Sequence, residues 1–508
     1  MHRQFSNPLT KFFTHQTVIF SLLTTELLIL LLVIFRNFSF DYLWYDESGQ
    51  FWIAKGLHHD SPPLSPAGSV SDVIDSNSHH NLDPGGFSIL LHWWTHISNA
   101  IVWLRMLPFL FLVGIAACTS YLTHWYFKNK LLTFLAIFLP FTYPVLLNMG
   151  FEIRAYSMEV FFTILMVVLL ERLSHGISPK RILLTSILMS IGMCSRYSAI
   201  IIAFIGAIYV FWMILKSDSR QKILCTLYLA LPLFSTLFAI YHNALKHQNL
   251  HLGQLSYLQY LNNNWLYLIR PLNLVYLLAL LILMMVYIKR KQWIKSDKFE
   301  ALLFVCLSAN ILYIGLSAMG LHPWRIGSKG NISVNYLMIV CMFVLGIFYL
   351  KRLPKSLRLS KLFFALICPI FIIYGYNRYL FPKHSESPYP RHDMHSSTAY
   401  HFEKIDSIKH QKIFVESWES PYLRYEFEYG KLRHMQHLYP SRFTFGNGMP
   451  HYDFPKKRGQ PVTIDPPPVM DEMLMYDLII SSELFNWSHA NNQHWQLIEG
   501  TKNFWERK

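Results

Sequence analysis

The chain has 508 residues, of which 53% are hydrophobic, 16% aromatic and only 15% charged. Soluble domains usually carry about 25% charged residues, so this composition argues against an ordinary soluble protein and indicates long segments that face lipid. The net charge of +15 comes from basic residues in short clusters between apolar runs, a pattern typical of cytoplasmic loops. We therefore expect membrane lipid around the chain and no nucleic-acid partner.

About eleven apolar runs of spanning or near-spanning length follow one another along the chain. The first covers residues 17–35 and is followed by Arg36-Asn37-Phe38 rather than by a small-residue cleavage site, so we interpret it as a retained spanning helix. The others begin near Met106, Leu131, Ala155, Ile182, Ala199, Ile223, Leu272, Ala301, Val334 and Leu362. Between the runs at 182 and 199, Cys194-Ser195-Arg196-Tyr197 predicts a tight turn at the membrane surface.

The distribution of lysine and arginine predicts the orientation of these runs. With the N-terminus in the cytoplasm, all the main basic clusters fall inside, at residues 128–130, 172–181, 216–222, 289–298 and 351–361. The outer side then receives residues 37–104, 148–154, 244–270 and 321–332, the turn at Arg196, and everything after about residue 375. We therefore predict a multi-pass protein with its N-terminus in the cytoplasm and its C-terminus outside.

Two regions outside the spanning runs are expected on the outer side. In the first outer loop, residues 37–104, the segments 46–57 and 85–97 predict short helices that lie in the membrane interface. Residues 378–508 open with a Pro- and His-rich linker, residues 381–395, and predict strands at 412–416, 476–481 and 495–499, with a helix over 419–429. We therefore divide the chain into a transmembrane domain, residues 1–377, which contains the loop, and a small α/β domain, residues 378–508.

Asp46-Glu47 places two adjacent carboxylates just outside the first spanning run. A carboxylate at the surface could act as the base for an acceptor hydroxyl in a group transfer. Acidic residues are also favoured in the first turn of any helix by the helix dipole, so a structural role for this pair is the alternative.

Charged residues also gather where other runs meet the outer surface. Glu152 and Arg154 precede the run at 155, and Arg196, Arg325 and Lys329 are exceptions to the rule that basic residues are sparse outside. Such residues usually have a partner or a task, and an anionic phosphate would explain them, as would contact with lipid headgroups. Asp83 begins Asp83-Pro84-Gly85-Gly86, which also fits a simple helix start.

Together these motifs resemble the polytopic glycosyltransferases of the GT-C class, especially the bacterial branch near the protein O-mannosyltransferases and the aminoarabinose transferase of lipid A. The resemblance is carried by the order of Asp46-Glu47, Asp83-Pro84-Gly85-Gly86-Phe87, Leu104-Arg105-Met106, Arg154-Ala155-Tyr156 and Cys194-Ser195-Arg196-Tyr197. It covers residues 40–215, and the remainder by topology alone. The chain departs from the family where Pro84-Gly85 replaces Pro-Pro and where Asn335-Tyr336 replaces Arg-Tyr.

The resemblance implies a bacterial inner-membrane enzyme that transfers a sugar from a polyprenyl-phosphate donor to a periplasmic glycan, lipid or protein. Asp46 would be the base and Glu47 a supporting acid, while Arg154, Arg196, Arg325 and Lys329 would stabilise the departing phosphate. Tyr156 and Asp83 would contact substrate. Transfer would be direct and inverting. No cofactor is required; a divalent metal is compatible with this class, and Glu152 would be its ligand.

Two other classes of protein are alternatives at this point. A transporter or flippase of a lipid-linked glycan would place ionisable residues near mid-bilayer and show internal repeats, whereas here the charges cluster at the outer surface. A membrane assembly protein without catalytic activity would not need the acidic pair. The sugar, the acceptor and the oligomeric state are not predicted by the sequence.

Overall fold

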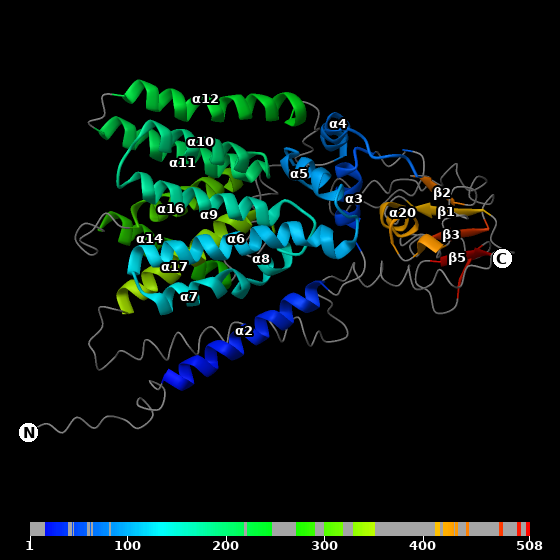
Figure 1. Cartoon of the computed structure of the whole chain (residues 1–508), viewed down its shortest axis with the longest axis horizontal. Coiled ribbons are helices and arrows are strands. Elements are labelled where there is room, and N and C mark those ends of the chain that lie inside the picture. Colours follow the sequence, from blue (N-terminus) through cyan, green and yellow to red (C-terminus); the bar gives the residue numbers. More distant parts are fainter. Residues whose placement is uncertain are drawn as a thin grey trace, which may run out of the picture. The chain divides into compact units, whose positions relative to one another are not determined.

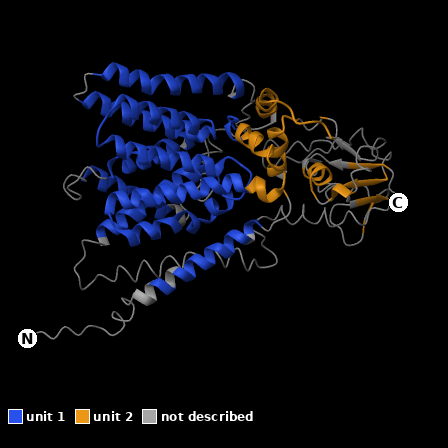
Figure 2. Cartoon of the chain, in the orientation of Figure 1, with its two compact units in different colours: residues 1–39, 83–87, 106–381 blue, residues 40–82, 88–105, 382–508 orange. Residues whose placement is uncertain are grey.

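The computed structural model describes residues 16–38, 43, 45–57, 61, 64–80, 83–217, 221–245, 271–289, 299–318, 329–350, 412–416, 420–430, 432–434, 443–446, 477–480, 495–498 and 504–508. The chain forms two compact units (Figure 2). Unit 1 comprises residues 1–39, 83–87 and 106–381, and unit 2 comprises residues 40–82, 88–105 and 382–508. This grouping differs from the predicted division at residue 377, because it places most of the first outer loop in the same unit as the C-terminal region.

Unit 1 is helical (Figure 1). Its described helices are α2 (Gln16–Phe38), α6 (Ile101–Phe127, from Met106 onward), α7 (Lys130–Phe138), η1 (Leu139–Thr142), α8 (Pro144–Met149), α9 (Tyr156–Leu173), α10 (Pro179–Met193), α11 (Tyr197–Lys216), α12 (Lys222–Ile240), η2 (Tyr241–Leu245), α14 (Pro271–Ile288), α16 (Glu300–Ala318), η3 (Lys329–Asn331) and α17 (Ile332–Leu350). Helix α9 packs against α8, α10, α11, α16 and α17, so it is the central helix of this unit.

Five helices in the described part of the chain are long and apolar enough to cross a membrane. They cover Ile101–Phe127, Tyr197–Lys216, Lys222–Ala244, Glu300–Ser317 and Lys329–Tyr349. Shorter apolar helices cover Thr24–Phe35, Lys130–Thr142 and Leu274–Ile288. These helices support a membrane protein, but the predicted count of about eleven spans is not confirmed.

Two further predicted runs form helices that belong to neither of these groups. Helix α9 carries three charged side chains, Glu159, Glu171 and Arg172, and its apolar surface is covered by neighbouring helices rather than left for lipid. Helix α10 has 15 residues, fewer than the roughly 20 that a bilayer crossing requires. The predicted run at residue 362 lies outside the described residues.

The turn between α10 and α11 was predicted and is found. Helix α10 ends at Met193, and Arg196 is the extended residue before α11. The carbonyl oxygen of Cys194 accepts a hydrogen bond from the backbone nitrogen of Gly86 at 2.9 Å. A Cβ atom on Gly86 would lie 2.6 Å from the Cβ and carbonyl oxygen of Cys194. Glycine therefore allows residues 83–87 to approach this turn closely.

Unit 2 contains helices and a small sheet. The helices are α3 (Tyr45–Ala54), α4 (Val70–His80), α5 (Gly86–Thr95, from Ser88 onward) and α20 (Ser420–Glu428), and the strands are β1 (Ile413–Glu416), β2 (Phe443–Gly446), β3 (Leu478–Ile480), β4 (Trp495–Leu497) and β5 (Phe504–Arg507). The strand order is β2-β1-β3-β5-β4, with β1 parallel to β2 and β3, and β5 antiparallel to β3 and β4. The predictions of α3, α5, α20, β1, β3 and β4 are confirmed, whereas α4, β2 and β5 were not predicted.

Candidate functional site

Arg196 is the centre of a charged cluster in unit 1. Its Nε lies 3.3 Å from Oδ1 of Asp83, and its Nη1 lies 3.1 Å from Oε2 of Glu159. The guanidinium carbon is 4.2 Å from the centroid of the Tyr156 ring, close enough for a cation–π interaction. The N-terminal end of α11, the segment 83–87 and the first turn of α9 therefore meet at one arginine.

Lys329 joins the same cluster from the N-terminal end of η3. Its Nζ is 5.5 Å from the centroid of the Tyr156 ring, and its carbonyl oxygen accepts a hydrogen bond from Arg196 Nη1 at 3.4 Å. The structure thus brings together Asp83, Tyr156, Arg196 and Lys329, all of which were predicted as substrate-binding residues. We call these four residues and Glu159 the arginine cluster.

Glu159 was not predicted as a site residue. Its side chain is only 1% exposed, and Oε1 accepts a hydrogen bond from the hydroxyl of Ser333 on α17 at 2.9 Å. It therefore connects α9 to α17 and to Arg196. The sequence did contain a signal, because an acidic residue inside an apolar run is costly unless it has a partner.

The arginine cluster combines two basic and two acidic side chains. Burial lowers the pKa of the Arg196 guanidinium, but the carboxylates of Asp83 and Glu159 outweigh that effect and raise the pKa above its usual value. Arg196 therefore stays charged, and its side chain is 18% exposed. Lys329 is exposed, so it is the more accessible of the two cations for an anion arriving from solvent.

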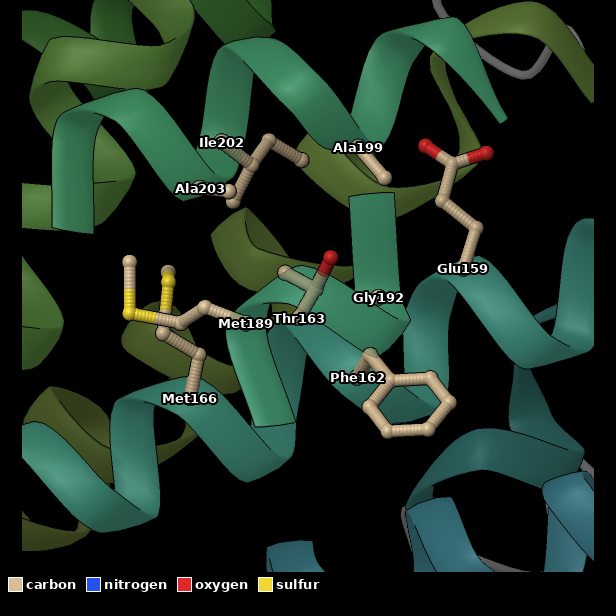
Figure 3. A pocket seen from close by; sticks show the side chains of 9 residues that line it. All are labelled: Glu159, Phe162, Thr163, Met166, Met189, Gly192, Ala199, Ile202 and Ala203. Atoms are coloured by element: carbon tan, nitrogen blue, oxygen red, sulfur yellow. The ribbon is translucent and has the colours of Figure 1, made fainter. Parts of the chain in front are cut away.

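A small cavity lies beside Glu159, between α9, α10 and α11. Figure 3 shows the Glu159 carboxylate at one end and Met166 and Met189 at the other, with Thr163 between them. Its volume is about 10 Å³, which is room for about one water molecule. In this conformation the cavity does not accommodate a sugar or a lipid chain.

The predicted acidic pair occupies the first turn of α3 in unit 2, and its two members differ in environment. The carboxylate of Glu47 pairs with Arg105 through two contacts, Oε1 to Nε at 3.3 Å and Oε2 to Nη2 at 3.0 Å. These side chains are 2% and 3% exposed, respectively. Asp46 is only partly buried, so it is the carboxylate more able to meet a substrate.

Buried hydrogen bonds hold α3 to α4 and α5. The side-chain amide of Gln50 donates to the Ser88 hydroxyl at 2.8 Å, and that hydroxyl donates to Asn77 Oδ1 at 2.7 Å. The ring nitrogen Nδ1 of His92 lies 2.8 Å from the carbonyl oxygen of Ala54. Asp46 is therefore presented from a helix that is fixed on two sides.

The remaining predicted residues are Glu152, Arg154 and Arg325. Glu152 and Arg154 lie in the turn before α9, where the Arg154 backbone nitrogen donates to the carbonyl oxygen of Glu152. Arg325 lies outside the described residues. Among the described residues, no group of three or more His, Cys, Asp or Glu side chains could hold a metal ion. The geometry therefore gives no support to a metal at Glu152, which stays a prediction.

Comparison with known proteins adds no relative: no protein-family model and no curated protein matches this sequence.

Proposed function

We propose that the chain is a membrane glycosyltransferase that uses a polyprenyl-phosphate-linked sugar as donor. The observation that carries the proposal is the convergence of Asp83, Tyr156, Arg196 and Lys329 from separate segments of a unit rich in apolar helices. A lipid-linked phosphate needs apolar helices for its chain and fixed cations for its charge. The same unit supplies both.

The proposed reaction assigns one role to each group. Asp46 takes the proton from the acceptor hydroxyl as its oxygen attacks the anomeric carbon of the sugar. The bond from that carbon to the phosphate oxygen breaks, and the electron pair leaves with the polyprenyl phosphate. By the same resemblance, Lys329 and Arg196, both in unit 1, are the groups assigned to the charge that grows on the departing phosphate. The single displacement inverts the anomeric configuration, and no step requires a metal.

The buried partner of Glu47 refines its proposed role. Because both carboxylate oxygens contact Arg105, Glu47 acts as an anchor that fixes the first turn of α3. Arg105 in turn neutralises the carboxylate beside Asp46. We therefore propose Asp46 as the base and Glu47 as its support. The cellular setting that accompanies this reaction is a bacterial inner membrane, with the acceptor, a glycan, lipid or protein, in the periplasm.

Substitution of Asp46 tests the proposal directly. The full chain in lipid nanodiscs is given a panel of undecaprenyl-phosphate pentoses and hexoses with an extract of periplasmic glycans, and release of undecaprenyl phosphate is followed. Asp46→Asn should lower kcat by about 100-fold or more. The matched control is Asp75→Asn, which alters an exposed carboxylate on α4 and should leave the rate unchanged. Equal rates for wild type and Asp46→Asn contradict the assignment and favour a transporter or an assembly protein.

A further inference from the structure

We propose that Tyr425, on the C-terminal helix α20, is a positioning residue for the acidic pair. It holds the segment that carries Glu47 and the segment that carries Arg105 in fixed relative positions. This inference rests on the proposed function for its catalytic consequence, but not for its structural content. It also assigns the C-terminal region a part in the site, which the sequence did not predict.

Tyr425 contacts both segments. Its hydroxyl donates a hydrogen bond to the carbonyl oxygen of Asn99 at 2.6 Å, six residues before Arg105. Its ring meets the Phe51 ring edge-on, with centroids 5.1 Å apart. Phe51 lies four residues after Glu47 on α3, so both project from the same face of that helix. One side chain therefore bridges the two segments whose separation sets the Glu47–Arg105 contact.

Other contacts hold α20 in place without Tyr425. The Arg424 guanidinium lies 4.3 Å from the centroid of the Trp52 ring, and its Nη1 donates to the carbonyl oxygen of Ser61 at 3.1 Å. Glu428 Oε1 accepts hydrogen bonds from Arg424 Nε and from the backbone nitrogen of Leu64, both at 3.0 Å. Loss of the Tyr425 hydroxyl should therefore leave α20 docked.

The environment of Tyr425 agrees with this role. Burial raises the pKa of its hydroxyl, and the charges of Arg105 and Glu47 are among those that act on it. The hydroxyl thus lies within electrostatic range of the ion pair and stays protonated, as a donor must. Tyr429, one turn later, also packs on Phe51, at 5.5 Å, but its hydroxyl makes no hydrogen bond to the described residues. It is the matched control.

The test compares Tyr425→Phe with Tyr429→Phe in the full chain in nanodiscs. Each variant loses one hydroxyl and keeps its ring. Hydrogen–deuterium exchange of peptides covering residues 45–54 and 99–105 measures whether these two segments stay fixed, and it does so independently of activity. Tyr425→Phe should speed exchange in both peptides, and Tyr429→Phe in neither. In the sugar-transfer assay, Tyr425→Phe should lower kcat about tenfold with KM unchanged.

The outcomes separate this inference from the proposed function. Unchanged exchange in Tyr425→Phe, or equal changes in both variants, overturns the positioning role. Where wild type transfers sugar, an unchanged kcat in Tyr425→Phe overturns it as well. If wild type transfers no sugar from any donor, the proposed function fails. Faster exchange in Tyr425→Phe alone would still support the link between α20 and the acidic pair.

Discussion

Single charged residues in this protein differ in how exposed they are. Arg196 has two carboxylates and an aromatic ring, and Glu47 has a buried arginine. Asp46 and Lys329 are the more exposed members of their clusters. Buried charged groups stabilise a site, whereas more exposed ones are accessible to a substrate. The proposed chemistry is therefore assigned to Asp46 and Lys329.

Lys329→Gln should lower kcat for sugar transfer by about 100-fold, because it removes an accessible positive charge from the departing phosphate. Lys329→Arg should restore part of the rate, since it keeps the charge. Lys130→Gln, which removes an exposed lysine at the start of α7, should have no effect. The same loss in Lys329→Gln and Lys329→Arg would show that charge is not what Lys329 contributes.

Lys55 provides a prediction about pH. Its side chain is buried, with Nζ 5.6 Å from the centroids of both Phe51 and Tyr429, and burial lowers its pKa from 10.5. The unfolded chain therefore binds the proton more tightly than the folded chain, and the cost of burying the charge is largest below the folded-state pKa. Stability should rise as pH climbs through that pKa toward 10.5.

The measurement is thermal unfolding in one detergent at pH 7.5 and at pH 10. Lys55→Met keeps the length of the side chain without its charge, so it should be at least as stable as wild type at pH 7.5. That advantage should shrink at pH 10. Lys130→Met is the exposed control and should match wild type at both values. A Lys55→Met variant that is less stable than wild type at pH 7.5 would show that the ammonium is favourably bound.

At the scale of elements, close approaches between distant segments place the side chains. The segment 83–87 meets the turn between α10 and α11 through Gly86, and this contact puts Asp83 beside Arg196. Sequence patterns predicted the helices and the turn, because these depend on local periodicity and capping. They did not predict which segments meet, because Asp83 and Arg196 are 113 residues apart and periodicity carries no information at that distance.

Gly86→Ala tests this contact. The new methyl group would overlap Cys194, so the segment must shift, at a cost of about 1–3 kcal/mol. Gly315→Ala on α16 is the control, because nothing lies within 4 Å of the position that its Cβ atom would take; it should be neutral or slightly stabilising. Thermal unfolding of both variants in the same detergent checks the difference. Equal stability of the two would argue against the contact.

For the molecule as a whole, composition and charge asymmetry predicted a membrane protein, and the apolar helices support it. The predicted number of about eleven spans is not confirmed: five helices in the described part of the chain are long and apolar enough to cross a membrane. The division into domains at residue 377 stays a prediction; in the structure α3 packs against α20, more than 300 residues later. Four of the predicted binding residues meet in one cluster, while Glu159 and Tyr425 became apparent only from the fold.

Sugar transfer from a polyprenyl phosphate is the property on which the proposed function depends. The most direct measurement is the anomeric configuration of the product formed by the purified full chain in nanodiscs, supplied with undecaprenyl-phosphate sugars of known configuration and periplasmic acceptors. We expect that one donor is consumed, that undecaprenyl phosphate is released in equal amount, and that the transferred sugar has the inverted configuration. Retention of configuration, or no donor consumed above the Asp46→Asn background, would contradict the proposed function.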